Sequence, residues 1–176
     1  SQSLGVKTNQ TLVVKFPGHT EGLNTKLEAM KKTIARLPLV YQVTFSGAVP
    51  GEEVATFLSN RRTNDALKQN RLYEMLACDP DYVDAYGLQV VAGRNFSEDY
   101  GDDVDKLVIN ETAVRNLGFT SNDEAIGELV NVECTDAPMQ IIGVVKDYHQ
   151  QALSKNYTPI MLIHKDKIAW LPQRYI

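Results

Sequence analysis

The sequence predicts an α+β fold in which a mixed middle segment is inserted into a lobe built by both ends of the chain. Three observations lead to this prediction. A strand–helix–strand pattern opens the chain, short helices and strands alternate in the middle, and the last part returns to strands. With 176 residues, the chain is long enough for one domain or for two small lobes that share a core.

The opening segment has the clearest periodicity. Alternating apolar residues predict a strand over Leu12–Phe16. Apolar residues spaced like one helical stripe then run from Leu23 to Leu37, and Pro38 must end that helix. A second alternation predicts a strand over Tyr41–Phe45. This unit is long enough for a right-handed crossover between two parallel strands.

The next segment is harder to assign. Few bulky apolar residues lie between Glu52 and Asn70, so we expect a weak strand or a mobile flap near Val54–Ser59. The charged run Arg61–Asp65 has the composition of an exposed turn. A better strand pattern follows over Arg71–Cys78, where apolar residues occupy both faces.

A helix start signal comes directly after that strand. Asp79 is expected as the N-cap, and Pro80 suits the first helical position. The helix Pro80–Tyr86 should end at Gly87, because glycine accepts the positive φ that follows a helix. A short strand over Leu88–Val91 and a turn at Gly93 come next.

The remaining elements begin with a strand over Lys106–Ile109, followed by Asn110 as the N-cap of a helix that Gly118 ends. Ser121 and Glu124 fit a capping box for one short helical turn. The sequence then predicts three closing strands, namely Leu129–Cys134, Met139–Val145 and Pro159–Ile163.

Charge and hydropathy limit the classes of partner. The formal net charge is −4, whereas a nucleic-acid partner needs a basic surface. Eight acids and one base lie between Asp79 and Asp105, a pattern typical of a solvated face. No apolar run is long enough for a membrane span. The chain starts with Ser1 and stops at Arg174-Tyr175-Ile176, which resembles the opening of a strand, so we expect a fragment of a longer protein.

No motif in the sequence points to a reaction centre. The histidines have no i, i+3 or i, i+4 partner, and neither a G-x-S-x-G elbow nor a phosphate-binding P-loop occurs. An EF-hand counted from Asp99 would need glycine at Val104 and glutamate at Asn110. We therefore predict no catalytic, cofactor-binding or metal-binding residues, and no cofactor.

Cys78 and Cys134 are the two cysteines, and both fall in segments with strand patterns. Their small apolar side chains suit a protein core, which is the favoured interpretation. A single disulfide between them stays open as the alternative.

The motifs together resemble those of a known family. Pro80–Phe96 is similar to the "P-x-Y-F…G…L…GR-x-F" signature of the MacB-like periplasmic core domain of MacB/FtsX-type ABC transporter permeases. Val108–Ala113 resembles its "V-I-N-E-T-A" segment, Ala125-Ile126-Gly127 its "A-I-G" step, and Ile142–His149 its "I-G-V-V-K-D-F-H" segment. Val83 departs from the pattern, which usually has an aromatic residue at this position.

The start of the chain is similar to Bacteroidetes-type members of this family, and Glu52–Asn70 matches poorly. The matching residues have structural interpretations rather than chemical ones, because glycines end helices and turns while Asn110 caps. The residues that the resemblance marks as structural are Asp79, Pro80, Tyr82, Gly87, Gly93, Arg94, Phe96, Asn110, Gly118, Gly127, Gly143 and Asp147.

The resemblance implies two lobes. A porter-like βαβ lobe would comprise residues 1–47 and 151–176, and the inserted mixed α/β lobe would comprise residues 48–150. If both ends lead into helices of one membrane, the strands Leu12–Phe16 and Pro159–Ile163 should share one sheet.

The resemblance also implies a function. The chain would be the periplasmic domain of a bacterial inner-membrane permease, and it would transmit an ATP-driven conformational change in export or in lipoprotein or peptide transport. It would not be an enzyme, because ATP hydrolysis would reside in a separate nucleotide-binding domain or subunit. Implied partners are the permease's transmembrane helices, the ATPase, and a periplasmic adaptor or a lipoprotein or peptide substrate. The isolated fragment is expected to be monomeric. The alternative function is a free-standing secreted domain that binds a ligand or a protein.

Overall fold

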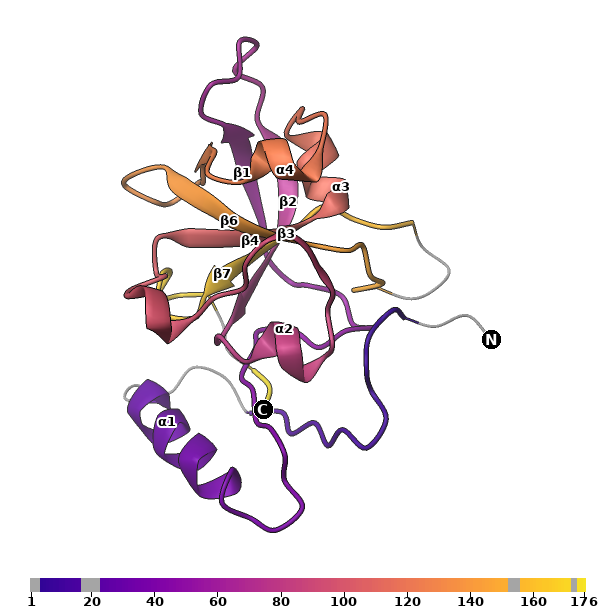
Figure 1. The fold of residues 1–176 in the computed structure, drawn as a ribbon. Coiled ribbons are helices and arrows are strands. Elements are labelled where there is room, and N and C mark those ends of the chain that lie inside the picture. Colours follow the sequence, from indigo (N-terminus) through magenta and orange to yellow (C-terminus); the bar gives the residue numbers. More distant parts are fainter. Residues whose placement is uncertain (1–3, 17–22, 152–155, 172–173) are drawn as a thin grey trace.

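The computed structural model describes residues 4–16, 23–151, 156–171 and 174–176, and it has a mixed α/β fold around one sheet. The strand order is β3-β6-β4-β7-β2-β1-β5, and β5 pairs with β6 as well, so six strands form a closed ring (Figure 1). The strands are β1 (Phe57–Arg62), β2 (Arg71–Cys78), β3 (Val90–Gly93), β4 (Lys106–Asn110), β5 (Leu129–Asn131), β6 (Met139–Val145) and β7 (Ile160–His164).

Both faces of the central strands are buried. On β2, Tyr73 and Met75 belong to one apolar cluster, while Leu76 and Cys78 belong to the other. α3 (Glu111–Asn116) and α4 (Asn122–Ala125) cover the first cluster, and α2 (Tyr82–Ala85) covers the second (Figure 1). Burial on both sides explains why several strands are continuous apolar runs in the sequence.

The expected caps Asn110 and Ser121 and the expected helix stops Gly87 and Gly118 are confirmed. The Asn110 side chain accepts the Ala113 N–H at the start of α3, and the Ser121 hydroxyl accepts the Glu124 N–H at the start of α4. Gly87 and Gly118, which follow α2 and α3, have φ values of 63° and 85°. A 3-10 turn over Glu98–Tyr100 (η1), which the sequence did not indicate, lies in the acidic loop.

The opening unit differs in detail from its prediction. α1 (Leu23–Ile34) ends one turn early. The expected strand Leu12–Phe16 is reduced to an isolated bridge at Lys15, and the expected strand Tyr41–Phe45 does not form, since the isolated bridges there involve the next residue, Ser46. Tyr175 forms antiparallel bridges to both Lys15 and Ser46, so it lies between segments that we expected to be neighbours.

The expectation that Leu12–Phe16 and Pro159–Ile163 share one sheet is wrong. β7 is a strand of the ring, where it pairs in parallel with β2 on one side and antiparallel with β4 on the other. Its residues Ile160–Ile163 are all buried, as suits a strand that is covered on both faces. The partner of residues 14–16 is instead the segment 174–176.

Two further expectations are corrected near β1. Arg61 and Arg62 do not form an exposed turn but end β1, where the Arg62 guanidinium lies 4.3 Å from the ring centroid of Phe119 and pairs with Glu128. Cys134 is not in the core: β5 ends at Asn131, and Cys134 is exposed in the following turn. Cys78 is buried, and both thiols are free, which excludes the disulfide in this structure.

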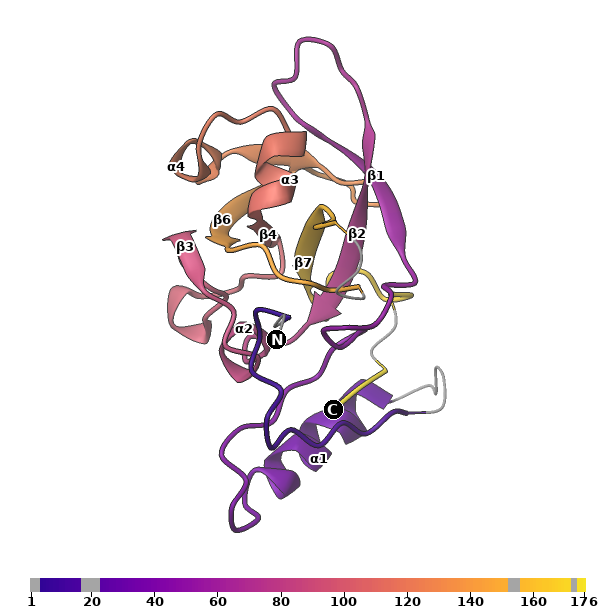
Figure 2. The ribbon, with the colours of Figure 1, turned by 90° about the vertical axis from the view of Figure 1, so that its right-hand side faces the viewer.

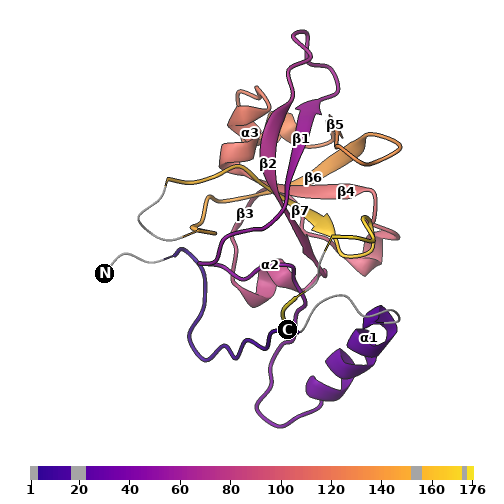
Figure 3. The ribbon, with the colours of Figure 1, turned by 180° about the vertical axis from the view of Figure 1, so that it is seen from behind.

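The molecule is elongated, with different elements at its two ends. The β1–β2 hairpin projects from one end, and α1 lies at the opposite end (Figures 2 and 3). The extended residues 8–16 and 174–176 lie in the half of the molecule that contains α1 (Figure 2).

Candidate functional site

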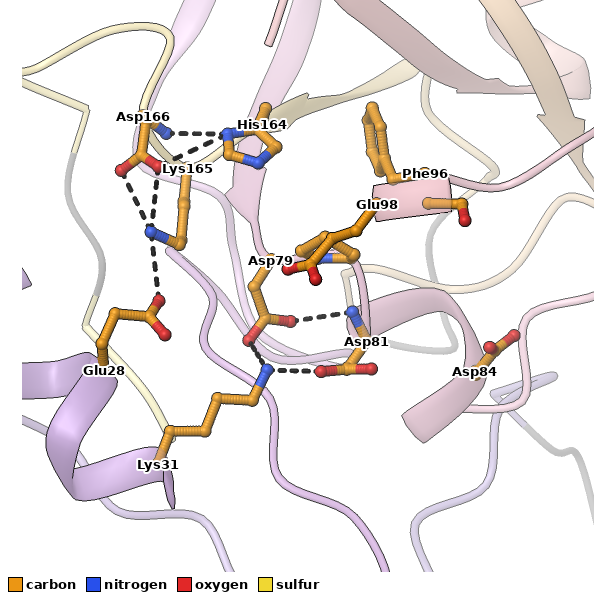
Figure 4. A pocket seen from close by; sticks show the side chains of 12 residues that line it. Glu28, Lys31, Asp79, Asp81, Asp84, Phe96, Glu98, His164, Lys165 and Asp166 are labelled. Carbon is orange, nitrogen blue, oxygen red and sulfur yellow. Dashed lines mark hydrogen bonds and ion pairs between the residues drawn. The ribbon is translucent and has the colours of Figure 1, made fainter. Parts of the chain in front are cut away.

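A polar cavity of about 510 Å³ lies where α1 faces the rest of the molecule (Figure 4). α1 contributes one wall, the β2–α2 junction a second, and the end of β7 a third. Its lining residues are Glu28, Lys31, Asp79, Pro80, Asp81, Asp84, Phe96, Ser97, Glu98, His164, Lys165 and Asp166. Charged side chains dominate, so this surface gains little from the hydrophobic effect.

Asp79 is the buried hub of the cavity, since only 1% of its surface is exposed. Its Oδ2 accepts the Phe45 N–H at 3.0 Å and a hydrogen bond from Lys31 Nζ at 2.7 Å. Its Oδ1 accepts the Thr44 hydroxyl at 2.6 Å and the Asp81 N–H at 3.1 Å. One carboxylate therefore joins α1, the segment after α1 and the start of α2.

This geometry corrects the predicted N-cap. The helix begins at Tyr82, so its N-cap position is Asp81, whose side chain makes no capping hydrogen bond. Asp79 instead holds the turn that leads into the helix through the Asp81 N–H. The sequence signal was sound for a turn and a helix start, but it could not show that most of the carboxylate's partners lie far away in the sequence.

Lys31 supplies the charge that faces this hub. Its ammonium group lies between the carboxylates of Asp79 and Asp81 and donates a hydrogen bond to each (Figure 4). Burial works against the charged form, but these hydrogen bonds outweigh it and raise the pKa of Lys31 above its usual value. Lys31 is therefore held as a cation at neutral pH.

A second set of charges connects α1 to the third wall, at the end of β7. Lys165 follows β7, and its Nζ lies 3.2 Å from Glu28 Oε1 on α1 and 3.0 Å from Asp166 Oδ2. Burial opposes the charge here too, yet the hydrogen bonds from Lys165 to Asp166 and Glu28 raise its pKa. Glu28 and Lys31 are one turn apart on α1, so the helix presents both signs of charge to the cavity.

Two other lining residues, His164 and Phe96, contact each other. His164 Nδ1 accepts the Asp166 N–H at 3.2 Å, and its ring meets the edge of Phe96 at a centroid distance of 6.4 Å. In the described part of the chain, no group of three His, Cys, Asp or Glu side chains could hold a metal ion. The arrangement therefore suits electrostatic docking of two parts of the molecule.

The residues of the family motifs do not gather at one site but are spread over the structure. Asp79, Pro80 and Phe96 line the cavity, while Tyr82 is buried in the cluster beneath α2. The Arg94 guanidinium donates two hydrogen bonds to the Asp103 carboxylate. Asp147 accepts the backbone N–H of Thr112 beside Asn110, at the start of α3.

The motif glycines also have distinct settings. Gly87, Gly93, Gly118 and Gly127 all have positive φ, which fits turns and helix ends. Gly93 pairs with Gly143 across β3 and β6. Neither these glycines nor Arg94 lines the cavity.

Among the cavity residues that sequence reasoning did not single out are Glu28, Lys31 and Lys165, which carry the ion pairs between α1 and the other walls. The available signal was an acid and a base one turn apart on a helix face, a pattern that usually indicates local pairing. Lys31 and Asp79 are 48 residues apart, and Glu28 and Lys165 are farther apart still, so only the fold brings these pairs together.

Comparisons with known proteins agree on the kind of domain. The family model described as the MacB-like periplasmic core domain matches residues 3–176. The extracellular domain of the noncanonic ABC-type transporter YknZ from Gram-positive bacteria is similar, with a TM-score of 0.59 at 17% identity over 93% of this chain and 80% of that one. The periplasmic region of MacB from Actinobacillus actinomycetemcomitans gives 0.57 at 20% identity over 97% and 72%. At these identities, the similarity of the structures concerns the fold.

The search of curated proteins gives no match. None of the helices in the described part of the chain has the length and apolar character needed to cross a membrane.

Proposed function

The chain belongs to the MacB-like periplasmic core domain family, and from this premise we propose that it transmits ATP-driven movement of a permease to a substrate or partner outside the membrane. The family places it as an extracytoplasmic domain of an ABC transporter permease. Such a domain does mechanical rather than chemical work, and we assign ATP hydrolysis to a separate nucleotide-binding domain or subunit.

One observation carries this proposal. The segments 14–16 and 174–176 are joined by backbone hydrogen bonds, and Tyr175 bridges onward to Ser46, which itself bridges to Cys78 at the end of β2. A displacement applied to either segment therefore reaches the closed ring through hydrogen-bonded backbone. The closed ring can turn as one body about this bridged connection, which suits a rigid-body movement.

We propose the two lobes of the resemblance in a modified form. The first unit comprises α1, the extended segments beside it and the segment 174–176. It is therefore built from both ends of the chain. The second is the ring, to which β7 also belongs because it pairs with β2 and β4. The boundary expected at residue 151 would then fall after His164.

The partners follow from the same premise. They are the transmembrane helices of the permease, its ATPase, and a periplasmic adaptor or a lipoprotein or peptide substrate in a bacterial inner membrane. The chain alone is expected to be a monomer at micromolar concentration, as light scattering can check, because the membrane helices would drive assembly.

The test uses a permease reconstituted with its ATPase. Flexible Gly-Ser segments are inserted where this domain joins the membrane helices, since such linkers behave as random coils and transmit little force. We expect ATP hydrolysis to continue and transport to stop, whereas a rigid insertion of equal length should retain transport.

Unchanged transport with the flexible insertions would contradict transmission. That result would favour the alternative function of a ligand- or protein-binding domain, which needs only to be present near the membrane.

A further inference from the structure

Two sets of ion pairs attach α1 to the rest of the molecule, and their charges are reversed. In one set the helix supplies the base, and in the other it supplies the acid. Lys31 on the helix faces Asp79 and Asp81, and Lys165 after β7 faces Glu28 on the helix. The helix thus offers one base and one acid, and the two walls that face it each offer the complementary charge (Figure 4).

Apolar packing of α1 is sparse by comparison. Of the α1 side chains whose burial the structure describes, only Leu27 is buried. Met30 and Ile34 are half-buried, although they continue the apolar stripe of the helix. The cavity of about 510 Å³ separates the helix from the β2–α2 junction, so contact across it depends on charges.

The pairs remain accessible to water and ions. Lys31 and Lys165 expose 18% and 13% of their side chains, and Glu28 and Asp81 expose 45% and 47%. Interactions of this kind weaken with ionic strength, because mobile ions screen exposed charges. Asp79 differs, since it is buried and keeps its backbone partners when Lys31 leaves.

We propose that these ion pairs form a salt-sensitive latch, so that α1 opens away from the ring at the polar cavity and closes again while the ring stays folded. The closed position of α1 along the cavity is specified by these charges. If the helix slid by one turn, Glu28 would face the aspartates or Lys31 would face Lys165, and like charges would repel. This deepens the proposed function by naming the joint at which the unit that contains α1 moves relative to the ring.

The test measures a distance between α1 and the ring by spin-label spectroscopy on the 176-residue chain. Cys134 is exposed on the ring and takes one label, Thr33→Cys on the exposed side of α1 takes the other, and Cys78 is buried. A control pair joins Cys134 to Asn70→Cys on the hairpin, so that both labels are on the ring.

The latch predicts one narrow α1–ring distance at about 0.01 M salt, where the screening length is about 30 Å, and an added longer distance at about 1 M, where it is about 3 Å. Glu28→Lys should show the longer distance even at low salt, because it faces Lys165. Combining Glu28→Lys with Lys165→Glu should restore the narrow distance. The control distance should stay constant throughout.

An α1–ring distance that is independent of salt in the unmutated chain and in Glu28→Lys overturns the latch. A control distance that broadens together with the α1–ring distance also overturns it, because the ring would then be unfolding as well. Since the measurement needs no transporter, its failure is distinct from the failure of force transmission in the reconstituted permease.

Discussion

Gly93 and Gly143 are partners in the antiparallel β3–β6 ladder, and the neighbouring backbone leaves no room for a Cβ atom on either of them. A Cβ added to Gly143 would lie 2.0 Å from the carbonyl oxygen of Arg94, and one added to Gly93 would lie 2.1 Å from that of Ile142. Each clash is with backbone, which cannot move aside as a flexible side chain could. The two motif glycines thus permit the close antiparallel pairing of β3 and β6 at this point.

We expect Gly143→Ala to lower the free energy of unfolding by about 3 kcal/mol or more, because the strands must separate to admit the methyl group. Gly118→Ala is the control, since a Cβ there would meet nothing within 4 Å and only its φ of +85° is strained. That control should cost about 1–2 kcal/mol. Equal urea midpoints for the two variants would show that the backbone around Gly143 has room for a methyl group.

Asp79→Ala should destabilise the chain by more than loss of an ordinary N-cap. The substitution removes an acceptor from the Phe45 N–H, the Asp81 N–H and the Thr44 hydroxyl, and it leaves Lys31 without its buried partner. We expect a loss of about 3 kcal/mol, since buried donors without acceptors are costly.

Ser121→Ala is the matched control for that variant, because Ser121 only caps α4. Its loss should be about 1 kcal/mol. Calorimetry or urea unfolding gives both values, and an Asp79→Ala loss no larger than that of Ser121→Ala would refute the role of Asp79 as a hub.

We expect Asp103 to make the free energy of unfolding depend on pH in the acidic range. Two hydrogen bonds from Arg94, at 2.8 and 2.9 Å, lower the pKa of Asp103 below 3.8, and the Ser97 N–H adds to this effect. A lowered folded-state pKa means stabilisation that is present above the unfolded pKa and is lost as the pH falls through the folded one.

The Asp103→Asn variant removes this contribution. At pH 7 we expect it to be less stable than the unmutated chain by about 1.5–3 kcal/mol, the usual range for hydrogen bonds to a charged group. The difference should narrow as the pH falls from 3.8 towards the lowered folded-state pKa, because the unfolded chain takes up the proton before the folded chain does. Urea midpoints measured across this range would contradict the assignment if the difference stayed constant.

Local signals predicted the elements whose causes are local. Asn110 and Ser121 were identifiable as caps because their partners lie three residues away, and apolar runs with residues on both faces identified β2 and β6. The position of β7 was not predictable in this way, because its apolar run fits any buried strand and its neighbours β2 and β4 are distant in the sequence.

The cavity was beyond sequence reasoning for the same physical reason. Asp79 was recognised as a polar residue at a helix start, but its role depends on Lys31 and Phe45, which arrive there through folding. Arg62 was assigned to a turn because charge usually indicates exposure, whereas here Phe119 and Glu128 partner it at the end of β1.

The most direct test of force transmission locks the joint between α1 and the ring. In a reconstituted permease with Cys134→Ser, the pair Lys31→Cys and Asp81→Cys, which replaces an ion pair across the cavity, is joined by a short reducible crosslinker. Each single-cysteine variant treated with the same reagent is the control. We predict that crosslinking stops transport, that ATP hydrolysis continues, and that a reductant restores transport. Full transport by the crosslinked protein would contradict the account, because the domain would then work without movement at this joint.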